Sequence, residues 1–316
     1  MNTIKKNDDV YGLNYKNWVA GLDGNMKDKI KNLHSKDQRW NLILVVFILM
    51  WISGAAIVYY SNFWAIDIIG YVLIGLCIHG MANLMHECIH NNLWKKEWQN
   101  SLFGFVCGIP SLFSMTSYKV NHLIHHKHTG AEGDPDEMQN MTNNKVILTI
   151  FFYLWLFVGI FIYLIHVPFN ALKFGNTKER IQIIVEYLII GAIIATVLFF
   201  LNQNDNLILV LDFWLIPMIF GGFLGNVRGW AEHMLTDKDH FLLNTRTVTS
   251  TKLFSFLFVN LNYHLEHHLF PKMPWYNLPV LHKMLLPEYK KVNATVYSSY
   301  VTFFFDAFRR GPHARI

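Results

Sequence analysis

Residues 64–90 read WAIDIIGYVLIGLCIHGMANLMHECIH, an apolar run that ends in two histidines. Asp67 is its only charged residue before Glu87. At 1.5 Å per residue, a helix over positions 64–85 is about 33 Å long, enough to cross the hydrocarbon core of a bilayer. His86 and His90 are spaced i, i+4, so both imidazoles leave the helix on one face. The stretch predicts a membrane-spanning helix with half of a metal site at its end.

The composition of the whole chain agrees with a membrane protein. Of its 316 residues, 53% are hydrophobic and 16% are charged, and the mean hydropathy of +0.23 exceeds that of a typical soluble domain. The formal charge of +5 comes without a basic run interleaved with aromatics, which favours anionic lipid over nucleic acid as a partner. Its three cysteines give no disulfide framework, and its polar N-terminus is not expected to be a signal peptide. We therefore predict an all-α integral membrane protein.

Four apolar stretches are predicted to cross the membrane. They cover residues 41–60, 64–85, 181–201 and 207–227. Residues 1–39 are rich in lysine and form a segment that the positive-inside rule assigns to the cytoplasm, followed by a single membrane domain over 40–316. An even number of spans returns the C-terminus to the cytoplasm. There the basic tail with Arg309, Arg310 and Arg315 is interpreted as a membrane-surface cap.

A fifth apolar stretch, residues 146–165, makes the parity of the spans a problem. If it crossed, the histidines before and after it would face opposite sides of the bilayer and could not share a metal centre. The connection that follows carries Lys173, Lys178 and Arg180, so it too is assigned to the cytoplasm. We predict that this stretch is interfacial or re-entrant. Residues 101–115 are apolar but too short to cross, and are predicted to be buried or re-entrant.

Nine histidines fall into four places at the predicted cytoplasmic face. They are His86, His90, His122, His125, His126, His233, His264, His267 and His268. The triplets within 122–126 and 264–268 share the spacing i, i+3, i+4, which puts three imidazoles on one helix face. Neutral imidazole suits iron, copper and zinc, and two ions with four or five ligands each would use this number. The pattern predicts a two-metal site.

Carboxylates beside these histidines could orient them through the second ring nitrogen. The candidates are Glu87, Asp134, Asp136, Glu232 and Glu266. Each of the five could equally be a solvated surface carboxylate. His79, inside a span, is interpreted as a ligand-orienting or packing residue rather than a ligand, and the isolated His282 as an ordinary hydrogen-bonded interior or surface residue. Trp230, Phe223 and Met234 are candidates for the lining of a substrate tunnel beside His233.

Other charged residues lie where the membrane surface is expected. Glu186 and Asp212 are near span ends, where a carboxylate can reach lipid headgroups. Lys119, Lys127 and Arg228 belong to the basic cytoplasmic face. That face is either an ordinary positive-inside surface or a docking site for an acidic electron donor or a lipid headgroup.

The order of the motifs resembles that of the membrane fatty acid desaturases and hydroxylases, the histidine-box di-iron enzymes. The motifs are His-x-x-x-His at 86–90, His-x-x-His-His at 122–126, Glu-His at 232–233 and Asn-Tyr-His-x-x-His-His at 262–268. The resemblance extends over about residues 40–285. His264 stands where front-end desaturases usually have glutamine, and Gly229 stands where acyl-CoA desaturases have asparagine. These two departures argue against those subclasses.

The resemblance implies a non-haem di-iron oxidoreductase whose irons are held by the nine histidines. Its reaction would activate dioxygen to remove hydrogen from an unactivated C–H bond of a long apolar chain, as in an acyl-lipid desaturase. The chain has no Gly-x-Gly-x-x-Gly after a strand and no cysteine set for an iron–sulfur cluster. Electrons are therefore expected from a ferredoxin, rubredoxin or cytochrome b5 type donor, and no nucleic acid is expected as a partner.

Three alternatives remain open from the sequence. A hydroxylase or monooxygenase of the same superfamily, acting on an alkane, lipid or carotenoid, would use the same ligands. His-Glu-x-x-His at 86–90 also fits the zinc-protease motif, which would make the chain an intramembrane protease. That reading gives seven clustered histidines no role. A metal transporter would need ligands along the spans, where only His79 is found.

Overall fold

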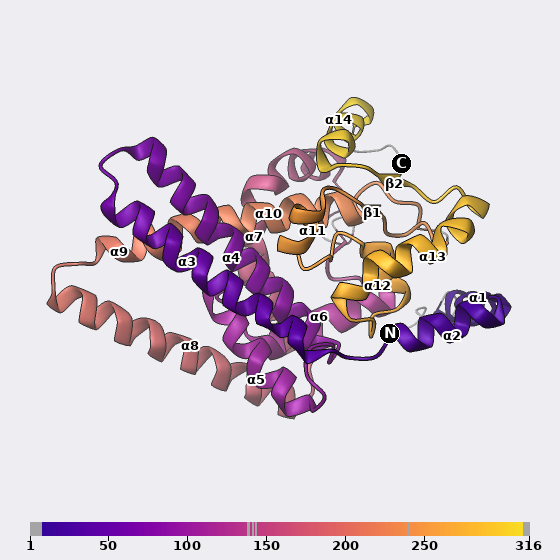
Figure 1. Cartoon of the computed structure of the whole chain (residues 1–316), viewed down its shortest axis with the longest axis horizontal. Coiled ribbons are helices and arrows are strands. Elements are labelled where there is room, and N and C mark those ends of the chain that lie inside the picture. Colours follow the sequence, from indigo (N-terminus) through magenta and orange to yellow (C-terminus); the bar gives the residue numbers. More distant parts are fainter. Residues whose placement is uncertain (1–7, 138–139, 141, 143, 239, 312–316) are drawn as a thin grey trace.

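The computed structural model describes residues 8–311 apart from 138, 139, 141, 143 and 239, and the described part is almost entirely helical (Figure 1). Two short strands, β1 (Thr247–Val248) and β2 (Val296–Tyr297), pair in parallel. Figure 1 shows α3, α4 and α8 extending together to one side of the molecule, with the C-terminal elements gathered on the other. Arg315 of the predicted basic tail lies outside the described residues.

Five helical stretches in the described residues are long and apolar enough to cross a membrane. Their main helices are α3 (Ile43–Tyr60, after the 3-10 turn Gln38–Leu42), α4 (Trp64–Ile89), α7 (Lys145–Phe174), α8 (Thr177–Gln203) and α10 (Ile216–His233). α10 continues from the short α9 (Ile208–Val210) through a π-helical turn, Leu211–Leu215. The four predicted spans therefore all coincide with helices. α7 qualifies by length and composition as well, so the prediction that its segment does not cross stays a prediction.

α4 is the central helix of the membrane part, and glycines set its distance from its neighbours. A Cβ on Gly70 would lie 2.7 Å from the carbonyl oxygen of Gly54 in α3. A Cβ on Gly75 would lie 2.9 Å from the carbonyl oxygen of Pro217 in α10. Small residues let membrane helices approach this closely, and the close packing fixes the ends of α4 and α10 relative to each other.

The connection from α4 to the second histidine motif consists of α5 (Glu97–Gly108), a 3-10 turn (Ile109–Ser111) and α6 (Met115–His128). α5 packs on α4, yet Trp98, Leu102 and Val106 on its outer side are exposed. The segment predicted as buried or re-entrant is therefore largely a helix that is buried on one side only.

The N-terminus of α6 is held by a buried carboxylate on α8. Glu186 accepts hydrogen bonds from Ser114 Oγ at 2.6 Å, from Thr116 N at 2.9 Å and from Thr116 Oγ1 at 2.7 Å. The prediction that Glu186 reaches headgroups is wrong, because its side chain is buried and these hydrogen bonds satisfy it. Asp212 accepts a hydrogen bond from Tyr71 at 2.8 Å.

The C-terminal part forms a cap over the ends of the long helices that carry the histidines. After β1 it contains α11 (Lys252–Leu257), α12 (His264–Leu269), a 3-10 turn (Trp275–Asn277), α13 (Leu278–Lys291), β2 and α14 (Tyr300–Arg310). The N-terminal helices α1 (Asp8–Gly21) and α2 (Gly24–Leu33) lie beside α12 and α13 (Figure 1). Tyr15 Oη donates to the carbonyl oxygen of Leu269 at 2.6 Å, so the first helix is tied directly to the third histidine motif.

Candidate metal centre

The nine predicted histidines meet where four helices end. α4 supplies His86, and His90 follows it by one residue. α6 supplies the second triplet, α10 ends at His233, and α12 supplies the third triplet. The close packing of α4 on α10 and the cap above them thus bring together residues that are far apart in the sequence.

Five of these histidines form a first group, here called the five-histidine group. Its members are His86, His90, His122, His126 and His267, and one ring nitrogen of each lies within 4.8 Å of all the others. His90 Nε2 is 3.0 Å from His122 Nε2, and His126 Nε2 is 3.1 Å from His267 Nε2. Four of the five side chains are buried.

The remaining histidines form a second group, here called the four-histidine group, on the side of α10. One ring nitrogen of each of His125, His233 and His268 lies within 4.8 Å of the other two. His264 joins them, because its Nε2 is 2.7 Å from His233 Nε2 and 3.0 Å from His268 Nε2. The two groups are adjacent, and the His126 and His268 rings stack at 4.2 Å between centroids.

The donor set fits metal ions. Two nitrogens at about 2.1 Å from one ion, with a right angle between them, are about 3 Å apart, close to the observed separations. Burial lowers the pKa of His90 to about 3 and takes the pKa values of His122, His126 and His267 well below the ordinary range. These imidazoles are therefore neutral, which is the metal-binding form. Each group could hold one ion.

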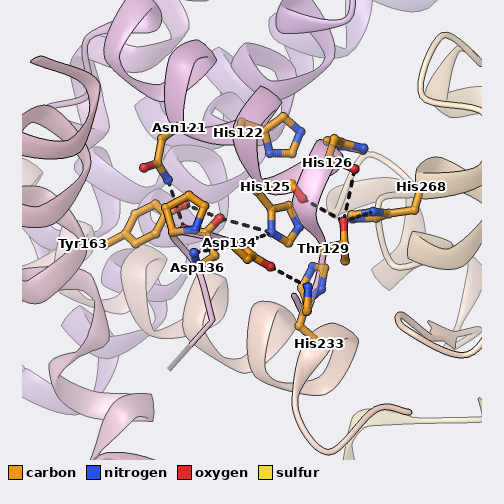
Figure 2. A network of polar contacts seen from close by, with 12 residues as sticks. Asn121, His122, His125, His126, Thr129, Asp134, Asp136, Tyr163, His233 and His268 are labelled. Carbon is orange, nitrogen blue, oxygen red and sulfur yellow. Dashed lines mark hydrogen bonds and ion pairs between the residues drawn. The ribbon is translucent and has the colours of Figure 1, made fainter. Parts of the chain in front are cut away.

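The four-histidine group contacts carboxylates of two elements. His125 Nδ1 is 2.9 Å from Asp134 Oδ1 and 3.8 Å from Asp136 Oδ2 (Figure 2). Burial lowers the pKa of His125, but the carboxylates of Asp134, Asp136 and Glu137 together outweigh burial and raise that pKa to about 9. His264 Nδ1 lies 3.2 Å from Glu232 Oε2. Both carboxylates leave the Nε2 side of their histidine pointing into the group, as expected for ligand-orienting residues.

The other two predicted carboxylates differ from each other. Glu87 is fully buried, lies 3.7 Å from His86 Nδ1 and accepts from the backbone N of Trp275 at 3.1 Å. Glu266 is equally buried, but it contacts His282 Nδ1 at 2.7 Å instead of one of the nine histidines. His282, interpreted from the sequence as a hydrogen-bonded interior or surface residue, is thus half of a buried pair inside the cap.

Of two arginines near the site, one was predicted from the sequence to lie elsewhere, and the other was not predicted at all. Arg228 was assigned to an exposed basic face, which is wrong: its side chain is 11% exposed, and its Nε donates to Glu232 at 3.0 Å. The i, i+4 spacing of this pair was the signal that could have shown it. Arg246 is buried and donates to the carbonyl oxygens of Ala231 and Met234, at 2.8 and 2.7 Å. It holds the end of α10 on both sides of His233, and its long-range contacts left no sequence signal.

A cavity of about 220 Å³ opens beside both histidine groups. At one end it is lined by members of both groups, and at the other by apolar side chains, among them Ile78, Met218 and Ile160. Trp230 and Met234 line it as predicted, whereas Phe223 is not among its lining residues. The cavity therefore brings an apolar chamber directly against the imidazole cluster.

Two glycines of α10 face this cavity one and two turns before His233. A Cβ on Gly229 would meet nothing within 4 Å, and one on Gly225 would meet only the His79 ring, at 3.8 Å. Gly222 differs, because its Cβ would lie 2.6 Å from the Ile160 side chain. Packing therefore explains Gly222, whereas Gly225 and Gly229 keep space open along the cavity.

Comparison with known proteins gives a consistent result. The fatty acid desaturase family model matches residues 62–300. A human sphingolipid delta(4)-desaturase is 27% identical over 291 residues, which cover 88% of this chain and 83% of the relative. A sphingolipid delta(4)-desaturase of Drosophila melanogaster is 24% identical over 295 residues, with 91% and 88% covered. A fatty acid desaturase of Bacillus subtilis is 25% identical over 221 residues, with 63% and 62% covered.

Proposed function

The chain belongs to the fatty acid desaturase family, and we propose that it is an acyl-lipid desaturase that works with two iron ions and dioxygen. The family makes it an oxidoreductase of the membrane. The observation that carries the finer proposal is the pair of adjacent histidine groups at the end of an apolar cavity. Nine imidazoles in two groups, six of them buried and three half-buried, suit two ions better than one.

The roles of the residues follow from their contacts. When bound, the irons would supply dioxygen activation and the removal of hydrogen from the substrate. The nine histidines would hold them, and Asp134 and Glu232 would fix the ring orientation of His125 and His264. The cavity would hold an unbranched chain against the histidines and keep water from its apolar end.

The substrate is proposed to be a long acyl chain carried by a membrane lipid. The supporting observation is the apolar end of the cavity between α4 and α10, two helices long and apolar enough to lie in lipid. The relatives act, by their names, on sphingolipid or fatty acyl chains. Electrons would come from a separate ferredoxin, rubredoxin or cytochrome b5 type protein.

We propose that both termini and the metal site are cytoplasmic and that α7 lies along the membrane surface. Both halves of α7 contact elements that lie near the histidines, which supports this topology. Tyr153 stacks on Phe308 of the cap at 6.0 Å, and Asn170 donates to Asn121, the neighbour of His122, at 3.4 Å. A reporter fused near Lys173 should read as cytoplasmic, and an external reading would contradict the proposal.

The decisive experiment is expression in a host of defined lipid composition, followed by mass analysis of the lipids. Loss of two hydrogens from an acyl chain supports desaturation, and gain of one oxygen supports the hydroxylase alternative. Metal analysis of the purified protein tests the remaining alternative, a zinc protease. About two irons per chain are expected for the oxidoreductase, whereas one zinc without iron would support the protease alternative.

A further inference from the structure

α14 has two apolar sides, and only one of them packs against the rest of the protein. Tyr300, Phe303 and Ala307 form the inner side and are buried in the cap. Phe304, beside them, stacks on Trp230 at 5.0 Å between ring centroids. α14 is therefore firmly packed on the wall of the cavity that Trp230 lines.

The outer side of α14 is a stripe of exposed apolar residues. Val301 is 78% exposed, Phe305 74% and Phe308 46%. Their spacing of i, i+4 and i+7 aligns them on one face of the helix. A contiguous stripe of this kind, with two aromatic rings, is unfavourable in water and marks a surface that another apolar phase covers.

The outer stripe continues the exposed apolar surface of α7. Tyr153 of α7 stacks on Phe308 with ring planes 10° apart, so the two helices meet at the stripe. Next to Tyr153, α7 exposes Ile150 and Leu154 by about half, at 49% and 48%. α7 has the length and apolarity of a membrane helix, so we expect its outer surface to contact lipid. The lipid expected on the outer face of α7 would therefore also contact α14.

Length and charge decide how α14 would meet that lipid. Its 11 residues form a helix of about 16 Å, too short to cross a core of about 30 Å. At 100° per residue, Thr302, Asp306 and Arg309 share one flank of the stripe, next to Arg310. Arg310 Nε donates to Asp306 at 2.8 Å, which holds that flank in place. The arrangement has one apolar stripe, one polar flank and two arginines at the end, as in helices that lie flat in a bilayer interface.

We propose that α14 is an interfacial anchor: its outer stripe inserts between the headgroups and acyl chains of the cytoplasmic leaflet, with Arg309 and Arg310 at anionic headgroups. The occupant of the stripe is thus lipid, and not a soluble partner or a second copy. Because α14 also packs on Trp230, three residues before His233, its insertion holds the cap and the third histidine motif against the membrane part.

Site-directed spin labelling of the full-length chain in nanodiscs of phosphatidylcholine and phosphatidylglycerol tests the anchor. Nitroxides are attached to Phe305→Cys and, as the matched control, to Thr302→Cys on the polar flank of the same helix. The native cysteines are all buried and give little background. The label at 305 should be accessible to oxygen and shielded from an aqueous nickel chelate, and the label at 302 should show the reverse ratio.

Two results would overturn the anchor. Equal exposure of both labels to the nickel chelate would mean that the stripe faces water. Protection of the label at 305 from oxygen and nickel together, with dipolar broadening between labels, would mean that a second copy covers it. Because accessibility is measured without turnover, the test does not depend on whether the chain is a desaturase. The Phe308→Cys label repeats the measurement if the first variant fails to fold.

Discussion

The two histidine groups lie side by side but are built differently. In the described residues, the five-histidine group has one carboxylate close by, Glu87, at 3.7 Å from His86. The four-histidine group has Asp134 and Glu232 within 2.9 and 3.2 Å of His125 and His264. One ion would thus be held by imidazoles with a single carboxylate at 3.7 Å, and the other by imidazoles that two carboxylates contact more closely. The comparison teaches that two sites made of one residue type can differ in affinity through their supporting carboxylates.

The largest effect is expected from removing a ligand of the five-histidine group. His267→Ala should abolish activity and lower iron from about two to about one ion per chain, since this group has little else to compensate. Iron per chain and lipid product are measured on the same preparation. His282→Ala is the matched control, because it removes a buried imidazole of the cap outside both groups. Full activity of His267→Ala would refute its role as a ligand.

A smaller loss is expected from the carboxylates of the four-histidine group. Asp134→Asn leaves His125 Nδ1 with a much weaker acceptor and should lower the affinity for one of the two ions about 10- to 100-fold. Glu266→Gln is the control, because Glu266 pairs with His282 instead. It should lower the melting temperature through loss of a buried hydrogen bond, without a change in iron affinity. Equal loss of iron in both variants would contradict the proposed difference between the two groups.

The cavity space beside Gly225 predicts that a larger side chain there changes which acyl chains the protein prefers. Gly225→Leu fills the cavity two turns before His233 and should disfavour the longest acyl chains about tenfold relative to shorter ones. Gly191→Leu on α8 is the control, because a Cβ there meets nothing within 4 Å and lies on an exposed face away from the cavity. The product profile is read by mass spectrometry. An unchanged profile in Gly225→Leu would show that the cavity glycines do not border the chain.

The smallest effect is expected from Glu186, because it supports a helix that supplies histidines to both groups. α6 supplies His122 and His126 to one group and His125 to the other, and Glu186 holds its N-terminus. Glu186→Gln should cost about 1–2 kcal/mol of stability and leave two irons per chain, because both groups shift together. Thermal unfolding and iron content check this. Selective loss of one iron would contradict the shared role.

The sequence predicted the helices and the histidines because both depend on local patterns. Apolar runs of fixed length and the spacing of His122, His125 and His126 are visible without a fold. Asp134 and Glu232 could be nominated because they are near histidines in the chain. Glu266 was nominated on the same ground and contacts His282, because neighbours in sequence can point to opposite sides of a short helix.

Other parts of the site could not be predicted, because they depend on contacts between distant segments. Glu186 reaches α6 from a helix 70 residues away, and Arg246 meets the end of α10 through the cap. Arg228 is a different case, because the i, i+4 spacing of its partner Glu232 is visible in the sequence. The positive-inside rule counts charges along the chain and takes no account of such a pair.

The tie between Tyr15 and Leu269 joins residues 254 positions apart, and the histidine groups draw on residues from 86 to 268. Each group draws on the third motif, through His267 in one and His264 and His268 in the other. A nascent chain that has not yet reached residue 264 therefore contains neither group in full. If each group holds one ion, as proposed, both ions can be fully coordinated only after the chain has been synthesised through residue 268 and α12 has packed beside the other three motifs.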